Sequence, residues 1–313
     1  MREKMLNFIR GICGTKHLLQ DVHELKRIEA AHHYEIRRNQ LIEHMMYGKE
    51  RGVTSEKYTD HEIIVSLTTY GKRIYDVAFT IESIMQQSMK ANRIVLWLDH
   101  SFDNKRLPQA LVEQQKRGLE IAFCTDIRSY TKLVPALRRF PNDAIITIDD
   151  DALYDYDLLE RLIVPYLEDS SYIYCYRYHR MKFDSEGQLL PYMQWDWACK
   201  NMEASHLNFL TGVGGVLYPP HSLSDEVTNE DVFLDICKHA DDVWFNAMAI
   251  MNGTKVKKVY TRNETCEEYL LNQEVQDVGL LNINTVGEQL NDKQIHAVFS
   301  KYDLYKIVKG CLQ

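Results

Sequence analysis

Short runs of Ile, Val and Leu alternate with amphipathic segments between about residue 61 and residue 265. The apolar runs predict strands, and the segments between them have the three- and four-residue spacing of helices. The expected strands are 63–67, 93–98, 120–123 and 145–148, and the expected helices are 78–87, 108–117 and 130–140. Repeated strand–helix–strand units predict an α/β fold with a mostly parallel sheet and right-handed crossovers.

Residues 1–57 have no strand pattern and predict a helical N-terminal extension. Its apolar positions recur at helical steps or multiples of them: Leu18, Val22, Leu25, Ile28 and Ile36. The segment begins with alternating basic and apolar residues, so one interpretation is a helix that touches anionic lipid. The other is a helix that packs on its own domain or on a partner. The chain is therefore divided into the extension over 1–57, an α/β domain over 58–265, and a polar closing tail or lid over 266–313.

Three adjacent acids, Asp149, Asp150 and Asp151, directly follow the strand at 145–148. The uninterrupted apolar run predicts a strand that is buried on both faces, and ligands sit at the carboxyl ends of such strands. Like charges at about 4 Å repel by roughly 4 kcal/mol at an effective dielectric near 20, so the cluster needs a counter-charge. Carboxylate oxygens suit Mg²⁺ or Mn²⁺. The acids therefore predict a metal–phosphate site, and the alternative is a solvated loop or helix cap.

Composition limits the class of protein. The chain has 313 residues, 45% hydrophobic and 26% charged, and a net charge of −8, which argues against a nucleic-acid partner. No apolar run approaches the roughly 18 residues of a membrane span, and the N-terminus lacks a signal-peptide core. Seven scattered cysteines without a CxxC pair indicate reduced thiols. We therefore expect a cytoplasmic location, with peripheral contact to the inner face of the plasma membrane as an option.

Dinucleotide and P-loop sites are not supported, because neither GxGxxG after the first strand nor GxxxxGK[ST] occurs. Instead, six segments occur together: 65–74 (VSLTTYGKRI), 80–84 (TIESI), 94–98 (IVLWL), 149–151 (DDD), 211–220 (TGVGGVLYPP) and 240–245 (ADDVWF). In combination they resemble the bacterial GT-A glycosyltransferases of capsule and surface-polysaccharide gene clusters. The resemblance spans roughly 60–300 and implies a Rossmann-like GT-A domain. It also implies metal-dependent transfer of a sugar from a nucleotide-sugar donor, with UDP favoured, to a growing or lipid-linked surface glycan.

The resemblance assigns donor-binding roles to the strand-end turns, the acids and a glycine loop. The residues implied are Ser66, Thr68, Thr69, Tyr70, Arg73, Asp99, Lys132, Asp149, Asp150, Gly214 and Gly215. The hydroxyls after the first strand would face the base and ribose of the nucleotide, and Asp99 would accept a hydrogen bond from one of these. Arg73 would contact the diphosphate, because a guanidinium matches phosphate geometry. On an extended chain Asp149 and Asp151 share one side and Asp150 points away. Asp151 is the expected metal ligand, Asp149 a ribose or metal contact, and His296 a further ligand for Mn²⁺ or Mg²⁺.

Catalytic and acceptor roles fall on two later segments. Asp241 and Asp242 begin a predicted helix, where capping explains at least one of them. The resemblance makes the other a general base, with Asp242 preferred, and favours an inverting displacement. Trp195, Asp196 and Trp197 form a candidate acceptor site, against the alternative of ordinary core tryptophans.

Two other functions remain open at this stage. A sugar-phosphate nucleotidyltransferase also uses acids and Mg²⁺, but it normally has a glycine- and arginine-rich phosphate loop, of which 68–73 is a poor version. A non-catalytic assembly protein would recruit partners through residues 1–50. The acids at 149, 151 and 242 argue against that reading.

Overall fold

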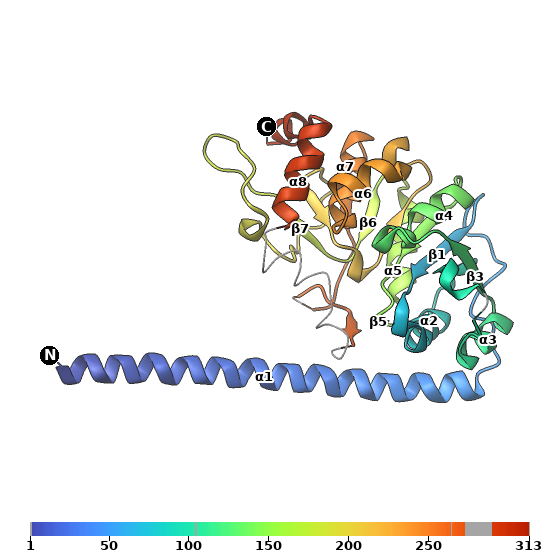
Figure 1. The fold of residues 1–313 in the computed structure, drawn as a ribbon, viewed down its shortest axis with the longest axis horizontal. Coiled ribbons are helices and arrows are strands. Elements are labelled where there is room, and N and C mark those ends of the chain that lie inside the picture. The colour runs from blue at the N-terminus through green and yellow to red at the C-terminus, as the bar shows by residue number, and fades with distance from the viewer. Residues whose placement is uncertain (1, 104, 264, 273–289, 313) are drawn as a thin grey trace.

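The computed structural model describes residues 2–103, 105–263, 265–272 and 290–312, and for 2–20 and 23 only the helical backbone (Figure 1). A seven-stranded sheet forms the centre, in the order β3-β2-β1-β4-β9-β6-β10. The strands are β1 (Ile63–Thr68), β2 (Arg93–Asp99), β3 (Leu119–Cys124), β4 (Ala144–Thr147), β6 (Ile173–Cys175), β9 (Val216–Tyr218) and β10 (Val256–Lys258).

The sheet is mostly parallel, as the sequence predicts. β1 pairs in parallel with β2 and β4, β2 with β3, and β6 with β10. β9 alone runs antiparallel to its neighbours β4 and β6. Along β1, Ile63 and Val65 join the apolar cluster on one face of the sheet and Ile64 joins the cluster on the other. Both faces are therefore covered by apolar side chains, which is the usual condition for parallel strands.

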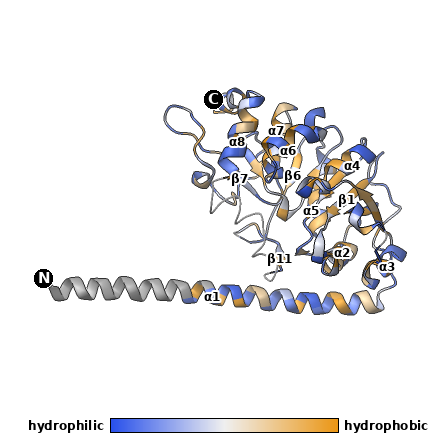
Figure 2. Ribbon diagram, in the orientation of Figure 1, coloured by the Kyte–Doolittle hydropathy of each residue, from blue (hydrophilic) through white to orange (hydrophobic). Residues whose placement is uncertain are grey.

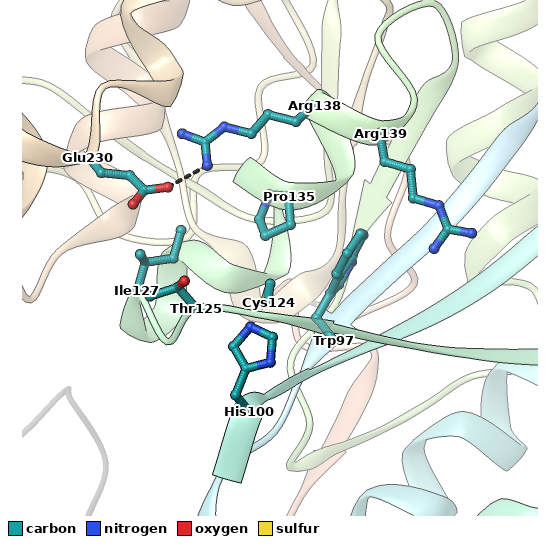
Figure 3. Close-up of a pocket in the computed structure, with 9 residues that line it drawn as sticks. All are labelled: Trp97, His100, Cys124, Thr125, Ile127, Pro135, Arg138, Arg139 and Glu230. Carbon is teal, nitrogen blue, oxygen red and sulfur yellow. Dashed lines mark hydrogen bonds and ion pairs between the residues drawn. The ribbon is translucent and has the colours of Figure 1, made fainter. Parts of the chain in front are cut away.

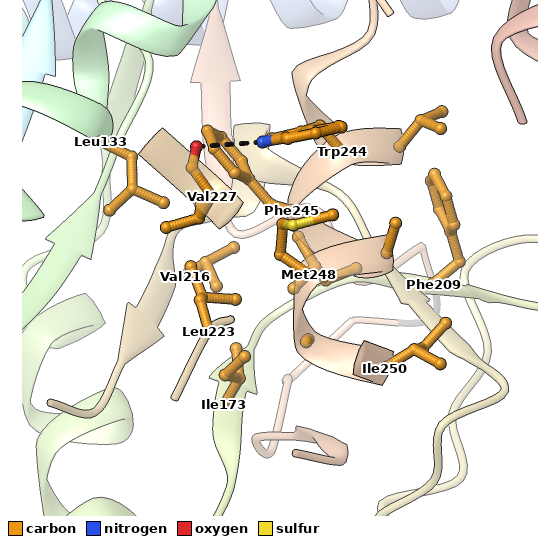
Figure 4. Close-up of a cluster of buried hydrophobic side chains, with 14 of the residues drawn as sticks. Leu133, Ile173, Phe209, Val216, Leu223, Val227, Trp244, Phe245, Met248 and Ile250 are labelled. Atoms are coloured by element: carbon orange, nitrogen blue, oxygen red, sulfur yellow. Dashed lines mark hydrogen bonds between the residues drawn. The ribbon is translucent and has the colours of Figure 1, made fainter. Parts of the chain in front are cut away.

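Helices cover both faces, and Figure 2 shows the apolar residues concentrated in the sheet and in these helices. One face carries α2 (Val77–Met85), α3 (Gln109–Lys116) and α5 (Leu158–Glu168). The other carries α4 (Val134–Arg139), α6 (Glu230–Ile236), α7 (Asp241–Met251), α8 (Leu290–Lys301) and α9 (Leu304–Gly310). In the cluster around α7, Trp244 Nε1 donates to Val227 O at 3.0 Å (Figure 4). This packing fixes the N-terminal end of α7, where Asp241 and Asp242 lie.

Some boundaries differ from the prediction. The expected helix 130–140 is a 3₁₀ turn (Arg128–Lys132) followed by α4, because Pro135 has no N–H and is accommodated in the first turn of a helix. β4 ends at Thr147, one residue early. Two separate two-stranded antiparallel sheets lie outside the main sheet. They are β5 (Ala152–Tyr154) with β11 (Tyr269–Leu271), and β7 (Tyr178–Arg180) with β8 (Asn208–Leu210).

The predicted N-terminal helix is confirmed as one element, α1 (Arg2–Tyr47), which runs along the body and projects beyond it (Figure 1). The face that packs is not the predicted apolar stripe. Tyr34 and Leu41 are buried against Phe79 of α2 and Leu153 of β5. The stripe residues Val22, Leu25, Ile28 and Ile36 are exposed. The helical period is a local property, whereas the contacting face depends on where the body lies. Among the described helices, α1 included, none is long and apolar enough to cross a membrane.

The packing of α1 gives a matched pair of stability tests. Leu41 is 0% exposed and Leu25 is 66% exposed on the same helix. Leu41→Ala should lower the free energy of unfolding by about 2–5 kcal/mol, because it leaves a cavity under α1. Leu25→Ala should change it by less than about 0.5 kcal/mol. Urea unfolding measures both. Equal effects would show that this part of α1 does not pack on the body in solution.

Candidate active site

The strand order reverses between β1 and β4, and the carboxyl ends of these two parallel strands lie side by side. In open α/β sheets this is where ligands bind. The turn after β1 contains Thr69 and Tyr70, and the turn after β4 contains the three acids. The structure therefore brings two of the sequence-predicted segments together at one edge of the sheet.

Asp150 ties these two turns together. It is buried, and its carboxylate accepts from Thr69 Oγ1 at 2.6 Å and from Arg73 NH1 at 2.7 Å. Thr80 Oγ1 donates to its backbone oxygen at 2.9 Å. Burial raises the pKa of Asp150, and Arg73 and Thr69 counter that effect. Asp150 is thus held by Thr69 and Arg73 from the segment after β1 and by Thr80 from α2.

The predicted geometry of the acids is wrong in one respect. Residues 150 and 151 form a turn, and Arg73 lies between their carboxylates, with its NH2 3.3 Å from Asp151 Oδ2. Asp150 therefore does not point away from Asp151. The side-to-side alternation of a strand stops applying because β4 ends at Thr147.

Lys132 connects the turn that contains Asp149, Asp150 and Asp151 (the acid turn) to α7. Its Nζ lies 2.8 Å from Asp149 Oδ1 and 3.1 Å from Asp241 Oδ2. The side chain is buried, and burial lowers its pKa, but the neighbouring carboxylates dominate and hold the pKa well above its usual value. The ammonium is therefore charged. It joins two acids that are far apart in the sequence.

Asp242, in the first turn of α7, lies beside Lys132 and the glycine loop (residues 212–215). Its Oδ1 accepts from Gly212 N at 3.1 Å. A Cβ at position 212 would lie 2.9 Å from Lys132 Nζ and 3.1 Å from that same oxygen, so any other residue there would displace the Lys132 ammonium. Burial raises the pKa of Asp242 to about 7, with Asp241 adding to the rise and Lys132 opposing it. A carboxylate with a pKa near neutrality is suited to general-base chemistry.

The other glycines shape the loop. Gly215 has a φ of +90°, and a Cβ at Gly214 would lie 3.0 Å from Tyr176 Cβ. Their nearest neighbours are core residues, whereas Gly212 faces the acids. Tyr154, which the sequence did not single out, joins loop and acid turn: its hydroxyl accepts from Asp149 N at 3.0 Å and donates to Val213 O at 2.9 Å. A core tyrosine in a short strand carries no sequence signal for such a role.

Two expected ligand contacts are occupied inside the protein. Ser66 is fully buried, where its Oγ donates to Lys132 O at 2.6 Å and accepts from Trp97 Nε1 at 2.9 Å. Thr68 Oγ1 donates to Trp97 O at 3.0 Å. The expectation that the Ser66 hydroxyl faces base and ribose is therefore wrong, because β1 is covered on both faces. The Thr68 and Thr69 hydroxyls also have internal acceptors.

Tyr70 and Asp99 keep accessible surface at this edge. Tyr70 is 56% exposed, with the Arg73 guanidinium 5.2 Å from its ring centroid. Asp99 is half-buried at the end of β2 and accepts from Ser101 N at 2.7 Å. Both lie at carboxyl ends of neighbouring parallel strands, so a bound ligand can reach them.

His296 does not join the acids. It is exposed on α8, with Nδ1 3.3 Å from the hydroxyl of Tyr305 in α9. Within the part of the chain that the structure describes, no three His, Cys, Asp or Glu side chains form a group that could hold a metal. The role of His296 as a further metal ligand therefore stays a prediction, with an ordinary surface histidine as the alternative.

The candidate acceptor residues separate into one core residue and two surface residues. Trp195 is 3% exposed, and its Nε1 donates to Leu190 O at 2.8 Å, so it is a core tryptophan. Asp196 is exposed and forms an ion pair with Lys182 at 3.1 Å. Trp197 is 37% exposed and stacks at 4.3 Å on the ring of His179.

The charges around the acid turn suit a divalent cation. Five carboxylates lie together there: Asp149, Asp150, Asp151, Asp241 and Asp242. Among the described residues, two cations form ion pairs with them, Lys132 and Arg73. Mg²⁺ and Mn²⁺ prefer oxygen ligands, and Mg²⁺ is commonly held by one or two carboxylates plus substrate phosphates. Asp149 and Asp151 fit such a site without a third protein ligand.

Two cavities lie away from the acids. One of about 440 Å³ lies between the ends of β2 and β3 and α4 (Figure 3). Its arginines are neutralised, because Arg138 forms an ion pair with Glu230, and Arg139 lies 3.1 Å from Glu120. Another of about 380 Å³ is lined by Trp195 and residues of α8 and α9. None of the five carboxylates lines either cavity.

No family model matches the chain, and no curated protein sequence matches it. Among solved structures it is similar to the mannosyltransferase PcManGT from Pyrobaculum calidifontis in complex with GDP-Man and Mn²⁺. The TM-score is 0.46 and the identity 13%, over 90% of this chain and 76% of that chain. The function is therefore argued from the residues of the site itself.

The raised pKa of Asp242 predicts a pH-dependent stability. Its folded-state pKa of about 7 exceeds the ordinary value near 4, so the folded protein binds this proton more tightly than the unfolded chain. Ionisation of Asp242 therefore destabilises the fold as pH rises from about 4 to about 7. Asp242→Asn lacks this charge, so its melting temperature relative to wild type should rise between about pH 5 and about pH 8. Asp231→Asn, at an exposed position on α6, is the control. A pH-independent difference for Asp242→Asn would contradict the prediction.

Proposed function

We propose that this protein is a GT-A glycosyltransferase, which moves a sugar from a nucleoside-diphosphate donor to a glycan acceptor with the aid of Mn²⁺ or Mg²⁺. The observation that carries the proposal is the single cluster in which Lys132 joins the strand-end acids to the head of α7. Acids suited to a metal and a carboxylate suited to take a proton at neutral pH lie together at the ligand-binding edge of a parallel sheet.

The acid turn is the proposed diphosphate site. Asp151 and Asp149 would hold the metal together with phosphate oxygens, and Arg73 and Lys132 keep these carboxylates in place. The metal, when bound, offsets the charge that develops on the departing nucleoside diphosphate. Tyr70 and Asp99 are the accessible groups nearest the ends of β1 and β2 and would contact the nucleoside.

Asp242 is the proposed general base. It takes the proton of an acceptor hydroxyl while that oxygen bonds to the anomeric carbon, and the bond from this carbon to the diphosphate breaks with its electron pair on the leaving oxygen. Asp241 is held by Lys132 and positions the head of α7. A single inverting displacement is supported by the sequence resemblance, which places the general base at the Asp241–Asp242 pair.

Donor, acceptor and location are finer parts of the proposal. A UDP-sugar donor and a capsule- or lipopolysaccharide-type acceptor, which is lipid-linked in many such systems, are supported by the sequence resemblance alone. The alternating basic and apolar residues at the start of α1 support peripheral contact with an anionic membrane at its cytoplasmic face, or self-association through 1–50. Trp197 and Asp196 are surface groups that an acceptor could meet.

The metal site can be tested by nucleotide binding. A nucleoside diphosphate at 100 times its dissociation constant should stabilise the wild-type fold by about 2.7 kcal/mol in the presence of Mn²⁺. Chelator should remove this stabilisation, and Asp151→Asn should abolish its dependence on metal, whereas Asp231→Asn should behave as wild type. Thermal unfolding with each common nucleoside diphosphate measures the effect. Equal stabilisation of wild type and Asp151→Asn, with or without chelator, would reject the metal assignment.

The base can be tested by separating binding from transfer. Asp242→Asn should leave nucleoside-diphosphate affinity nearly unchanged and reduce sugar transfer or donor hydrolysis by roughly 10²–10⁴-fold. Asp241→Asn is the matched neighbour. A larger loss in Asp241→Asn would make Asp241 the base and Asp242 the positioning residue. Release of pyrophosphate from a nucleoside triphosphate and a sugar phosphate would instead identify a nucleotidyltransferase.

A further inference from the structure

Arg177 is a basic residue of the site that neither the motifs nor the resemblance singled out. It lies two residues after the end of β6, and its backbone oxygen accepts from Thr211 N at 3.1 Å and from Thr211 Oγ1 at 3.3 Å. A Cβ at Gly214 would lie 3.7 Å from Arg177 Cβ. These contacts fix Arg177 alongside the glycine loop, whose first glycine touches Asp242.

The Arg177 side chain differs from the other two cations of the site. Lys132 and Arg73 are each shared between two carboxylates. Arg177 is half-buried, its Nε is buried without a hydrogen-bond partner, and it forms no ion pair with a carboxylate among the described residues. A buried donor without an acceptor is unfavourable, and an anionic ligand bound at Arg177 would supply the acceptor.

The electrostatic surroundings place the Arg177 charge near both parts of the cluster. Burial raises the pKa of Tyr192, Asp242 raises it further, and Arg177 lowers it. Burial also raises the pKa of Tyr269, which Arg177 lowers and Asp149 and Asp151 raise. The Arg177 charge therefore acts on Tyr192 together with Asp242, the proposed base, and on Tyr269 together with two acids of the acid turn.

We propose that Arg177 binds the diphosphate of the nucleotide ligand on the side of the glycine loop. A guanidinium donates two parallel N–H bonds to phosphate oxygens, and Nε–H is one of the donors in that arrangement. The diphosphate is the anion that the proposed function brings to this place, and the inference rests on that function. As the bond to the sugar breaks, the leaving oxygen gains negative charge, which a fixed guanidinium stabilises.

The test measures nucleotide affinity rather than turnover. Isothermal titration with UDP, GDP, ADP, CDP and dTDP in the presence of Mn²⁺ identifies the nucleotide that binds the wild type. Arg177→Gln should weaken binding of that diphosphate at least about tenfold and leave binding of the corresponding nucleoside unchanged. Arg177→Lys should retain part of the affinity. Arg180→Gln is the matched control, since Arg180 lies on β7, where its NH1 donates to Asn208 Oδ1 at 2.7 Å.

The outcomes separate this inference from the proposed function. Diphosphate binding that is equal in wild type and Arg177→Gln overturns the inference and leaves the function standing. Equal weakening of diphosphate and nucleoside, or a lower melting temperature without ligand, assigns Arg177 a structural role and also overturns the inference. If no nucleoside diphosphate binds the wild-type protein, the proposed function fails and the inference fails with it.

Discussion

The buried ammonium of Lys132 is the interaction on which the site depends. Asp149 follows β4, Asp241 begins α7, and almost a hundred residues lie between them; Lys132 brings their carboxylates together at 2.8 and 3.1 Å from one nitrogen. Buried like charges repel strongly unless a counter-charge lies between them. Without this ammonium, the acid turn and the head of α7 would separate or bind protons. The site is thus held by charge, on a frame that is held by apolar packing.

The same principle explains why the carboxylates differ in chemistry. Asp150 is satisfied by Thr69 and Arg73, which makes it a fixed part of the structure. Asp242 accepts from Gly212 N, but burial raises its pKa to about 7 and Asp241 adds to the rise. Asp150 therefore has a structural role and Asp242 is suited to proton transfer, although both lie in runs of adjacent aspartates in the sequence. Environment, not residue type, makes the difference.

The resemblance and the chemical pattern located most segments of the site but not the roles of individual side chains. Parallel strands with acids at their carboxyl ends had to converge, because ligands and loops gather where the strand order reverses. Ser66 was misjudged, and Trp195 stayed open between acceptor site and core, because a hydroxyl or an indole looks the same in the sequence whether it faces a ligand or the core. Tyr154 and Arg177 were missed because their positions carry no local pattern.

The sequence by itself determined the α/β class, the strands β1 to β4, the long helix α1 and the position of the acids after β4. These features follow from the hydrophobic periodicity of helices and from the continuous apolar runs of buried parallel strands. Both patterns are visible within short stretches of the chain. Only the tertiary structure decided which face of α1 packs, that the Ser66 hydroxyl is satisfied inside the protein, and that Lys132 and Gly212 meet Asp242. Such contacts join residues far apart in the chain. They depend on how elements are placed in space, which no local pattern specifies.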